Sequence, residues 1–285
     1  MEVKIKPDNF GRNYHSIPYF LIYDISYGSK RVLFQMGLRN NTMSYWAETQ
    51  KPMLYHPIAF LKFLNFKATY NNKTLIDQAN NFVKRIETDG FVKRMKIDGF
   101  KTVKFYIVQN ASNNELFNCS SKFGIIYNFE FLHLLKLHKE KKIPYNCKIE
   151  NMLLILAYLR EHIIFRSSGD FNSKKNIKKK PETYVTSIED IAEGVGIHRT
   201  TASKCIEALS DIGIIYHENL VRRIGERILN GRTIFANTYK YDGNQEYRLD
   251  TSYDHMKEVN EVKRQLKPYG EFGRKSYNSS TEIDD

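Results

Sequence analysis

The chain has 285 residues, of which 41% are hydrophobic, 13% aromatic and 27% charged. This composition excludes a disordered or collagen-like protein, and the length favours two compact domains. The formal net charge is +12, from 44 Lys and Arg against 32 Asp and Glu. A basic chain of this kind favours a polyanionic partner such as nucleic acid, because binding releases counterions from the polyanion.

Three cysteines, Cys119, Cys147 and Cys205, lie far apart in the sequence. Their odd number and wide spacing fit neither a disulfide framework nor paired zinc ligands. No run approaches the ~18 apolar residues of a membrane span, and the first ten residues lack the apolar core of a secretion signal. We therefore expect a cytoplasmic protein with no cofactor, no metal and no membrane partner.

The first half begins with residues 13–24, NYHSIPYFLIYD, which we interpret as an irregular arm or a short strand. Apolar residues at helical spacing then predict helices over 57–65 and 74–89, the second ended by Gly90. Two β-branched and aromatic runs, 91–97 and 100–108, flank Asp98-Gly99, a dipeptide that favours a two-residue hairpin turn.

Helix, glycine and hairpin together are typical of a winged helix, so we predict an N-terminal winged-helix-like domain over residues 1–115. As a second DNA-binding unit it would use polar residues of its second helix. These candidates are Lys73, Asn80, Asn81, Lys84 and Arg85. The alternative, equally open at this point, is a structural or dimerisation domain that binds no DNA.

Residues 109–122 are rich in Asn and Ser and predict a linker, followed by helices over 129–139 and 149–165. Residues 167–182, SSGDFNSKKNIKKKPE, are too polar and charged to pack and predict a basic loop. Such a loop is most often only solvated, but beside a DNA-binding motif it could follow a phosphate backbone. Its candidate lysines are Lys174, Lys175, Lys178, Lys179 and Lys180.

A helix-turn-helix pattern follows the basic loop. Ser187, with an acidic residue three positions on, predicts a helix N-terminus. Ala192 and Gly196 stand four positions apart, so a small residue allows two helices to approach and a glycine permits the sharp turn between them. The next helix turns apolar residues inward at three- and four-residue steps, namely Ala202, Cys205, Ile206 and Leu209.

The outward face of that helix combines hydroxyls with long cations, which suits a helix seated in a DNA major groove. The candidate recognition residues are Arg199, Thr200, Ser203, Lys204 and Glu207. Gly213 ends the helix, and 220–229 is expected to pair with 233–241 across Asn230-Gly231 as a wing. Arginines in or beside this wing would contact sugar-phosphate or the minor groove, namely Arg222, Arg223, Arg227 and Arg232.

Residues 188–215, IEDIAEGVGIHRTTASKCIEALSDIGII, resemble the helix-turn-helix of winged-helix regulators and of replication initiators from Gram-positive plasmids and phages. The matching positions are Ala192, Val195, Gly196, Ile197, Leu209 and Gly213. His198 departs from the pattern, because these families usually have a serine-type N-cap there. The opening residues 13–24 are also similar to the aromatic, Ile-Pro segment of initiators. The resemblance implies a DNA-binding module and covers about thirty residues.

Motifs of enzymes are missing from the sequence: it has no phosphate-binding GxxxxGK[ST] loop, no HExxH and no GxSxG. His133 and His138 are five residues apart, so they fall on different faces of a helix and do not form a metal pair. Residues 253–266 predict an amphipathic helix that packs on its own domain or forms a dimer contact, and 269–285 predict a disordered tail.

The sequence therefore predicts an α+β protein with tandem winged-helix modules, 1–115 and 123–250, and a C-terminal segment, 251–285. The predicted function is non-enzymatic, sequence-specific binding of double-stranded DNA, as a plasmid or phage replication initiator or regulator at repeated sites. A chromosomal transcription regulator and a winged-helix protein-interaction adaptor remain the alternatives. A homodimer and the replication or transcription machinery are the other expected partners.

Overall fold

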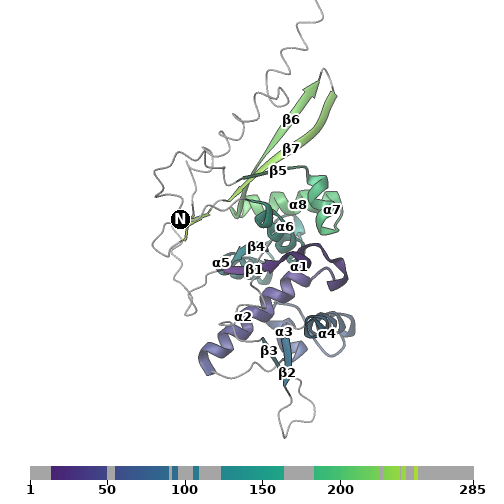
Figure 1. Ribbon diagram of the computed structural model, residues 1–285, viewed down its shortest axis with the longest axis vertical. Helices are drawn as coiled ribbons and strands as arrows, with labels where there is room; N and C mark the ends of the chain where they lie inside the picture. The colour runs from purple at the N-terminus through teal and green to yellow at the C-terminus, as the bar shows by residue number, and fades with distance from the viewer. Residues whose placement is uncertain are drawn as a thin grey trace, which may run out of the picture. The chain divides into compact units, whose positions relative to one another are not determined.

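The computed structural model describes residues 14–49, 55–89, 92–95, 105–108, 123–163, 183–224, 227–237, 239–241 and 247–249. It is an α+β structure of mainly helical character with short antiparallel strands (Figure 1). The chain forms two compact units, Asp8–Ala157 and Tyr158–Asp285. This division lies inside a helix and differs from the boundary near residue 115 that the sequence suggests, and 109–122 lie outside the described residues.

The N-terminal unit contains a strand pair that is distant in sequence. Strand β1 (Tyr14–Pro18) pairs antiparallel with β4 (Phe123–Tyr127), so that Tyr14 faces Tyr127. Residues 14–18 of the opening segment are thus a short strand, as one of the two interpretations had it, whereas 19–23 form a helix that neither interpretation included. It leads into α1 (Tyr19–Tyr23) and the short 3-10 helix η1 (Ile25–Tyr27). Residues beyond the predicted linker therefore belong to this unit.

Helix α2 (Arg31–Thr49) is the longest described helix of the unit, and the sequence reading had not predicted it. Its polar residues Arg31, Gln35 and Arg39 stand four positions apart, which is a helical spacing, but every residue from 31 to 39 is buried, so this stripe does not mark a solvent-exposed face. Arg31 is buried, and its guanidinium caps the C-terminus of α1. Its Nε donates to the Leu21 carbonyl and its Nη2 to the Ile22 carbonyl, both at 2.7 Å. These bonds satisfy carbonyls that the short helix leaves unpaired.

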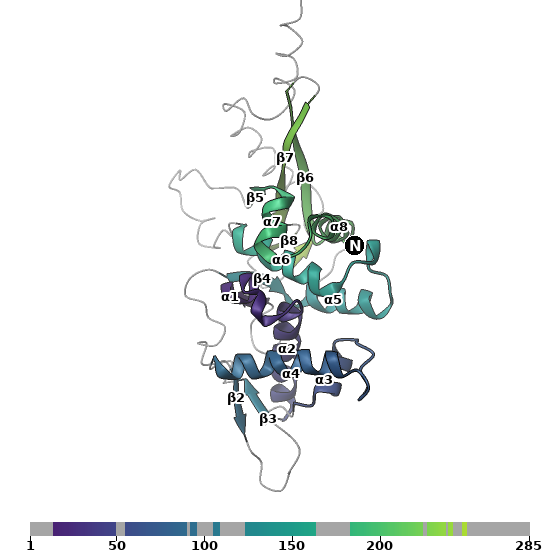
Figure 2. The same cartoon turned by 90° about the vertical axis from the view of Figure 1, so that its right-hand side faces the viewer.

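The two helices predicted next are confirmed as α3 (Pro57–Phe63) and α4 (Lys73–Thr88), although Gly90 lies outside the described residues. Phe34 of α2 packs edge-on against Phe82 of α4, with ring centroids 5.7 Å apart, and Figure 2 shows α4 lying across α2. Ala79, Val83 and Ile86 complete the buried stripe of α4.

The first hairpin has a different register from the predicted one. A two-residue turn at Asp98-Gly99 would place Ile97 opposite Phe100, whereas the structure pairs β2 (Val92–Met95) with β3 (Phe105–Val108) and puts Met95 opposite Phe105. Asp98-Gly99 itself lies outside the described residues, so the turn there stays a prediction.

The two later helices are confirmed as α5 (Asn128–Lys139) and α6 (Ile149–His162), with the 3-10 helix η3 (Pro144–Asn146) between them. The described part of α6 ends three residues before the predicted Phe165. Among the residues that the structure describes, no helix is both long and apolar enough to cross a membrane.

The C-terminal unit has the order β5 (Thr183–Thr186), α7 (Ile188–Val195), α8 (Arg199–Asp211), β6 (Ile215–Ile224) and β7 (Arg227–Asn237). The strands form one antiparallel sheet in the order β5-β7-β6. Figures 1 and 2 both show β6 and β7 as a long hairpin that extends beyond α7 and α8. Two shorter strands follow, β8 (Tyr239–Tyr241) and β9 (Tyr247–Leu249).

The predicted turn of this second hairpin was wrong. Ile224 pairs with Arg227, so Asn230-Gly231 lies inside β7 and not at the turn. The register shifts there, because Leu220 faces Arg232 while Arg222 faces Leu229. Asn230 and Gly231 together oppose the single residue Val221, which makes the dipeptide the long side of a β-bulge, a position that glycine favours.

Candidate nucleic-acid interface

Helix α7 begins where the sequence predicts, because its first turn is capped reciprocally. The Ser187 hydroxyl accepts a hydrogen bond from the Asp190 amide at 3.0 Å, and Asp190 Oδ2 accepts from the Ser187 amide at 3.3 Å. The Thr186 hydroxyl donates to the same carboxylate oxygen at 3.1 Å. These bonds form a capping box that fixes the direction in which α7 leaves the sheet.

The turn between α7 and α8 depends on Gly196, which adopts the left-handed conformation at φ 72° and ψ 40°. The Ile197 amide then donates to the Ala192 carbonyl at 2.9 Å. His198 caps the next helix with its ring, since Nδ1 accepts from the Thr200 amide at 3.3 Å and lies 2.8 Å from the Thr200 hydroxyl. An imidazole thus occupies the place of the serine-type cap of the resembling families.

Helix α8 has one buried face and one outward face. Its buried residues are Ala202, Cys205, Ile206, Ala208 and Leu209, none more than 1% exposed. Four of the five candidate recognition residues are exposed, namely Arg199, Thr200, Lys204 and Glu207, and Ser203 is half-buried. The structure therefore brings these five side chains together on one side of a single helix.

Close packing against the end of α6 holds α7 in place. A Cβ added to Gly194 would lie 2.5 Å from Cε2 of Tyr158, so only glycine allows this contact without a shift. The Tyr158 ring packs on His162, which stacks on Tyr184 of β5, each with centroids 4.5 Å apart. Burial raises the pKa of the Tyr158 phenol far above its usual range. The sequence reading identified Ala192 as the small residue of the motif but missed Gly194.

An ion pair joins the first turns of α7 and α8. Nε of Arg199 contacts Oε1 of Glu189, and both side chains are more than half exposed, at 66% and 55%. In the sequence, Glu189 is recognisable only as an acidic residue in the first turn of α7, where a negative charge favours a helix N-terminus. No spacing rule relates a residue of one helix to a residue ten positions later across a turn, so the pair could not be found from the sequence.

The four candidate wing arginines lie on β6 and β7. Arg222 faces Leu229, Arg223 faces Ile228 and Arg227 faces Ile224, which are the last three residue pairs before the turn. Arg232 lies beyond the bulge, opposite Leu220. The corrected register therefore concentrates three of the arginines at the end of the hairpin.

His217 lies near the base of the same hairpin and stacks on Phe235 of β7, with ring centroids 6.4 Å apart. Its Nδ1 atom is buried without a hydrogen-bond partner among the described residues. Burial lowers the pKa of the imidazole, and the nearby carboxylates of Glu207 and Asp211 oppose that shift. Burial therefore favours the neutral form of the ring.

The candidate DNA-binding residues on α4 differ in exposure and in hydrogen bonding. Lys73, Asn81 and Lys84 are exposed, but Asn80 is half-buried and its Oδ1 accepts a hydrogen bond from the Tyr55 hydroxyl at 3.3 Å. Asn80 is thus a packing residue. The loop lysines 174–180 lie outside the described residues.

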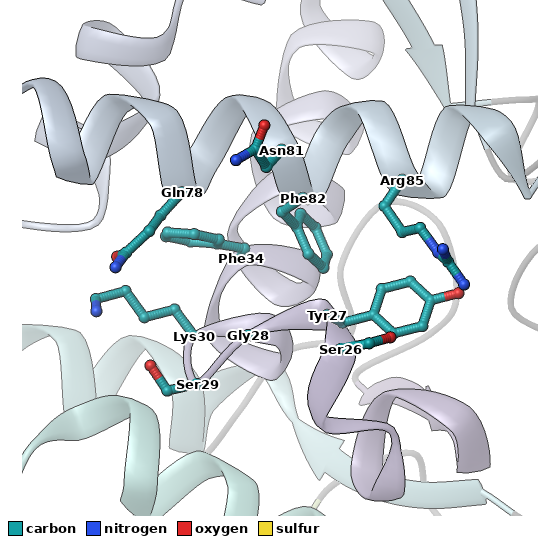
Figure 3. A pocket seen from close by; sticks show the side chains of 10 residues that line it. All are labelled: Ser26, Tyr27, Gly28, Ser29, Lys30, Phe34, Gln78, Asn81, Phe82 and Arg85. Atoms are coloured by element: carbon teal, nitrogen blue, oxygen red, sulfur yellow. The ribbon is translucent and has the colours of Figure 1, made fainter.

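Arg85 is exposed but interacts with two neighbouring side chains, Asp89 and Tyr27. Its Nε lies 3.2 Å from Oδ2 of Asp89, and its guanidinium carbon lies 5.2 Å from the centre of the Tyr27 ring. Figure 3 shows Arg85 and Tyr27 at one end of a cavity of about 220 Å³, with Lys30 and Gln78 at the other. Arg85 therefore helps to join α4 to residues 26–30.

Comparison with known proteins gives no relative: the chain matches no protein-family model, no curated protein and no solved structure.

Proposed function

We propose that the chain is a sequence-specific double-stranded DNA-binding protein whose C-terminal unit acts as a winged helix-turn-helix. The observation that supports this function best is the outward face of α8, on which Arg199, Thr200, Lys204 and Glu207 are exposed while the opposite face is buried. The order strand, helix, helix, hairpin is the order of a winged helix. In such modules the second helix enters the major groove.

The dimensions and chemistry of α8 agree with this role. An α-helix with its side chains is about 10–12 Å in diameter, and the major groove is roughly 12 Å wide, so α8 fits into the groove. Arg199 and Lys204 would contact guanine, which presents two acceptors in that groove, and Glu207 would accept from the amino group of cytosine. Thr200 and Ser203 offer short hydroxyls that suit either base or phosphate.

The hairpin would position the module rather than read sequence. Arg222, Arg223 and Arg227 stand within three residue pairs of its end. Cations placed there would reach sugar-phosphate or the minor groove on one side of α8. The net charge of +12 adds a sequence-independent attraction to the same partner.

The biological role that we propose is that of a plasmid or phage replication initiator or regulator, acting on repeated sites as a homodimer and recruiting other machinery. This choice rests on the resemblance of residues 188–215. A transcription regulator would use the same surface at a promoter, and a protein-interaction adaptor would leave DNA unbound. Footprinting on the DNA that carries the gene separates the three, because only the first protects iterated sites near an origin.

The test of DNA binding starts with selection of a preferred site from a random duplex library. Arg199→Ala and Lys204→Ala should each weaken binding to the selected site by about 1–3 kcal/mol and relax the preference for one base pair. Lys136→Ala, which removes an exposed cation from α5, is the control and should leave that preference unchanged. Wild-type protein that shows no affinity for any duplex at low salt would refute the proposal.

A further inference from the structure

We infer that Glu189 is a positioning residue that orients Arg199 for base recognition, an inference that rests on the DNA-binding function proposed above. The carboxylate stands in the first turn of α7 and contacts Nε of Arg199, the first residue of α8. The residues at the N-terminus of a recognition helix are those that usually meet base edges. Arg199 therefore occupies the position where the orientation of a side chain affects specificity most.

The contact with Nε is compatible with simultaneous binding of a base. A guanidinium carries five N–H donors in one plane. Nε–H and one N–H of the neighbouring Nη form a side edge, while the remaining inner N–H groups of the two Nη atoms form an end edge. A carboxylate on the side edge leaves the end edge able to bind O6 and N7 of guanine together.

Orientation matters because a free arginine side chain loses rotamer entropy when it is fixed. A partner that already restricts the side chain before DNA arrives reduces that cost, which is the general effect of preorganisation. The ion pair itself adds little to folding stability, since both side chains are more than half exposed. The expected contribution of Glu189 is therefore to base discrimination.

Lysine cannot replace Arg199 in this arrangement. Its ammonium group is a point charge without two planar edges, so one group cannot bind Glu189 and a guanine side by side in a fixed geometry. Arg199→Lys keeps the charge but should lose the dependence on Glu189.

The experiment compares Glu189→Gln with Glu193→Gln, using the site selected by the wild-type protein and the same site changed at the base pair read by Arg199. Glu193 is also exposed on α7, one turn further along, so both variants remove one negative charge from the same helix. Both should bind random duplex somewhat more tightly, because the net charge rises. Only Glu189→Gln should lose discrimination at that base pair, by about 3- to 10-fold out of the roughly 5- to 150-fold that a bidentate contact provides.

The results that would overturn the role of Glu189 differ from the result that would refute DNA binding. Equal discrimination in the two variants, with thermal melting unchanged, would overturn the role of Glu189 and leave DNA binding intact. A double variant, Glu189→Gln with Arg199→Lys, should discriminate no less than Arg199→Lys alone if the carboxylate acts through the guanidinium. An additional loss in the double variant would also overturn the inference. Absence of binding by the wild-type protein would instead refute the proposed function.

Discussion

The turn between α7 and α8 should depend on backbone conformation alone at Gly196. Its φ of 72° and ψ of 40° lie in the left-handed region, which costs an ordinary L-residue roughly 1–2 kcal/mol. We expect Gly196→Ala to destabilise α7 and α8 by about that amount, and Gly196→Asn to restore most of the stability, because asparagine tolerates this region. A loss of that size would increase the unfolded fraction about 5- to 30-fold.

Hydrogen exchange of peptides from residues 188–211 measures this effect on the helix pair itself. Gly28 provides the contrast, since its φ of 85° and ψ of 167° lie in a region that only glycine occupies readily. A Cβ on Gly28 would meet nothing within 4 Å, so its cost is also conformational. Both Gly28→Ala and Gly28→Asn should destabilise α2, by about 1–3 kcal/mol. If Gly196→Asn accelerates exchange as much as Gly196→Ala, the conformational explanation is wrong.

Three other predictions concern the wing, its base and the N-terminal unit. Arg222→Ala should weaken binding to all duplexes alike and lower the slope of log affinity against log salt by about 0.9. Titration at several salt concentrations measures that slope. A loss of affinity confined to one sequence would contradict a phosphate-positioning role. Because burial lowers the pKa of His217, the unfolded state binds the proton more readily, so stability should fall as the pH drops below about 6.5. His217→Phe should reduce that dependence in urea unfolding between about pH 7 and pH 5, and an unchanged slope would argue against it. Gly124→Ala would place a Cβ 2.2 Å from the Ala157 carbonyl oxygen, so the melting temperature should fall markedly, whereas wild-type melting would refute the close approach.

The helix pair α7–α8 could be predicted because its signals are local. A serine cap, an apolar stripe and a left-handed glycine each act within a few residues, and all three stand where the sequence indicated. The outward face of α8 followed from the same periodicity, so the candidate site was largely accessible to sequence reasoning.

The parts that sequence reasoning missed depend on distant contacts. β1 pairs with β4, whose residues follow more than one hundred positions later, and nothing local in either strand identifies its partner. Helix α2 does carry polar residues at helical spacing, Arg31, Gln35 and Arg39, but all three are buried, so their positions depend on tertiary contacts and not on exposure to solvent. Asn230-Gly231 predicted a turn, but the pairing of β6 with β7 puts it inside a strand, since register is decided by the packing of whole strands.

The orientation of α8 is fixed by contacts that its own apolar stripe does not reveal. Tyr158 fills the space opposite Gly194 on α7. Arg160 is fully buried and lies half a helical turn further along α6. Its Nη2 donates to the Ile214 carbonyl at 3.4 Å, just after α8 ends. The last turns of α6 thus contact the segments before and after α8. In the proposed function α8 has to present its side chains within about 0.5 Å of a productive position, so substitution of Tyr158 or Arg160 should also lower DNA specificity.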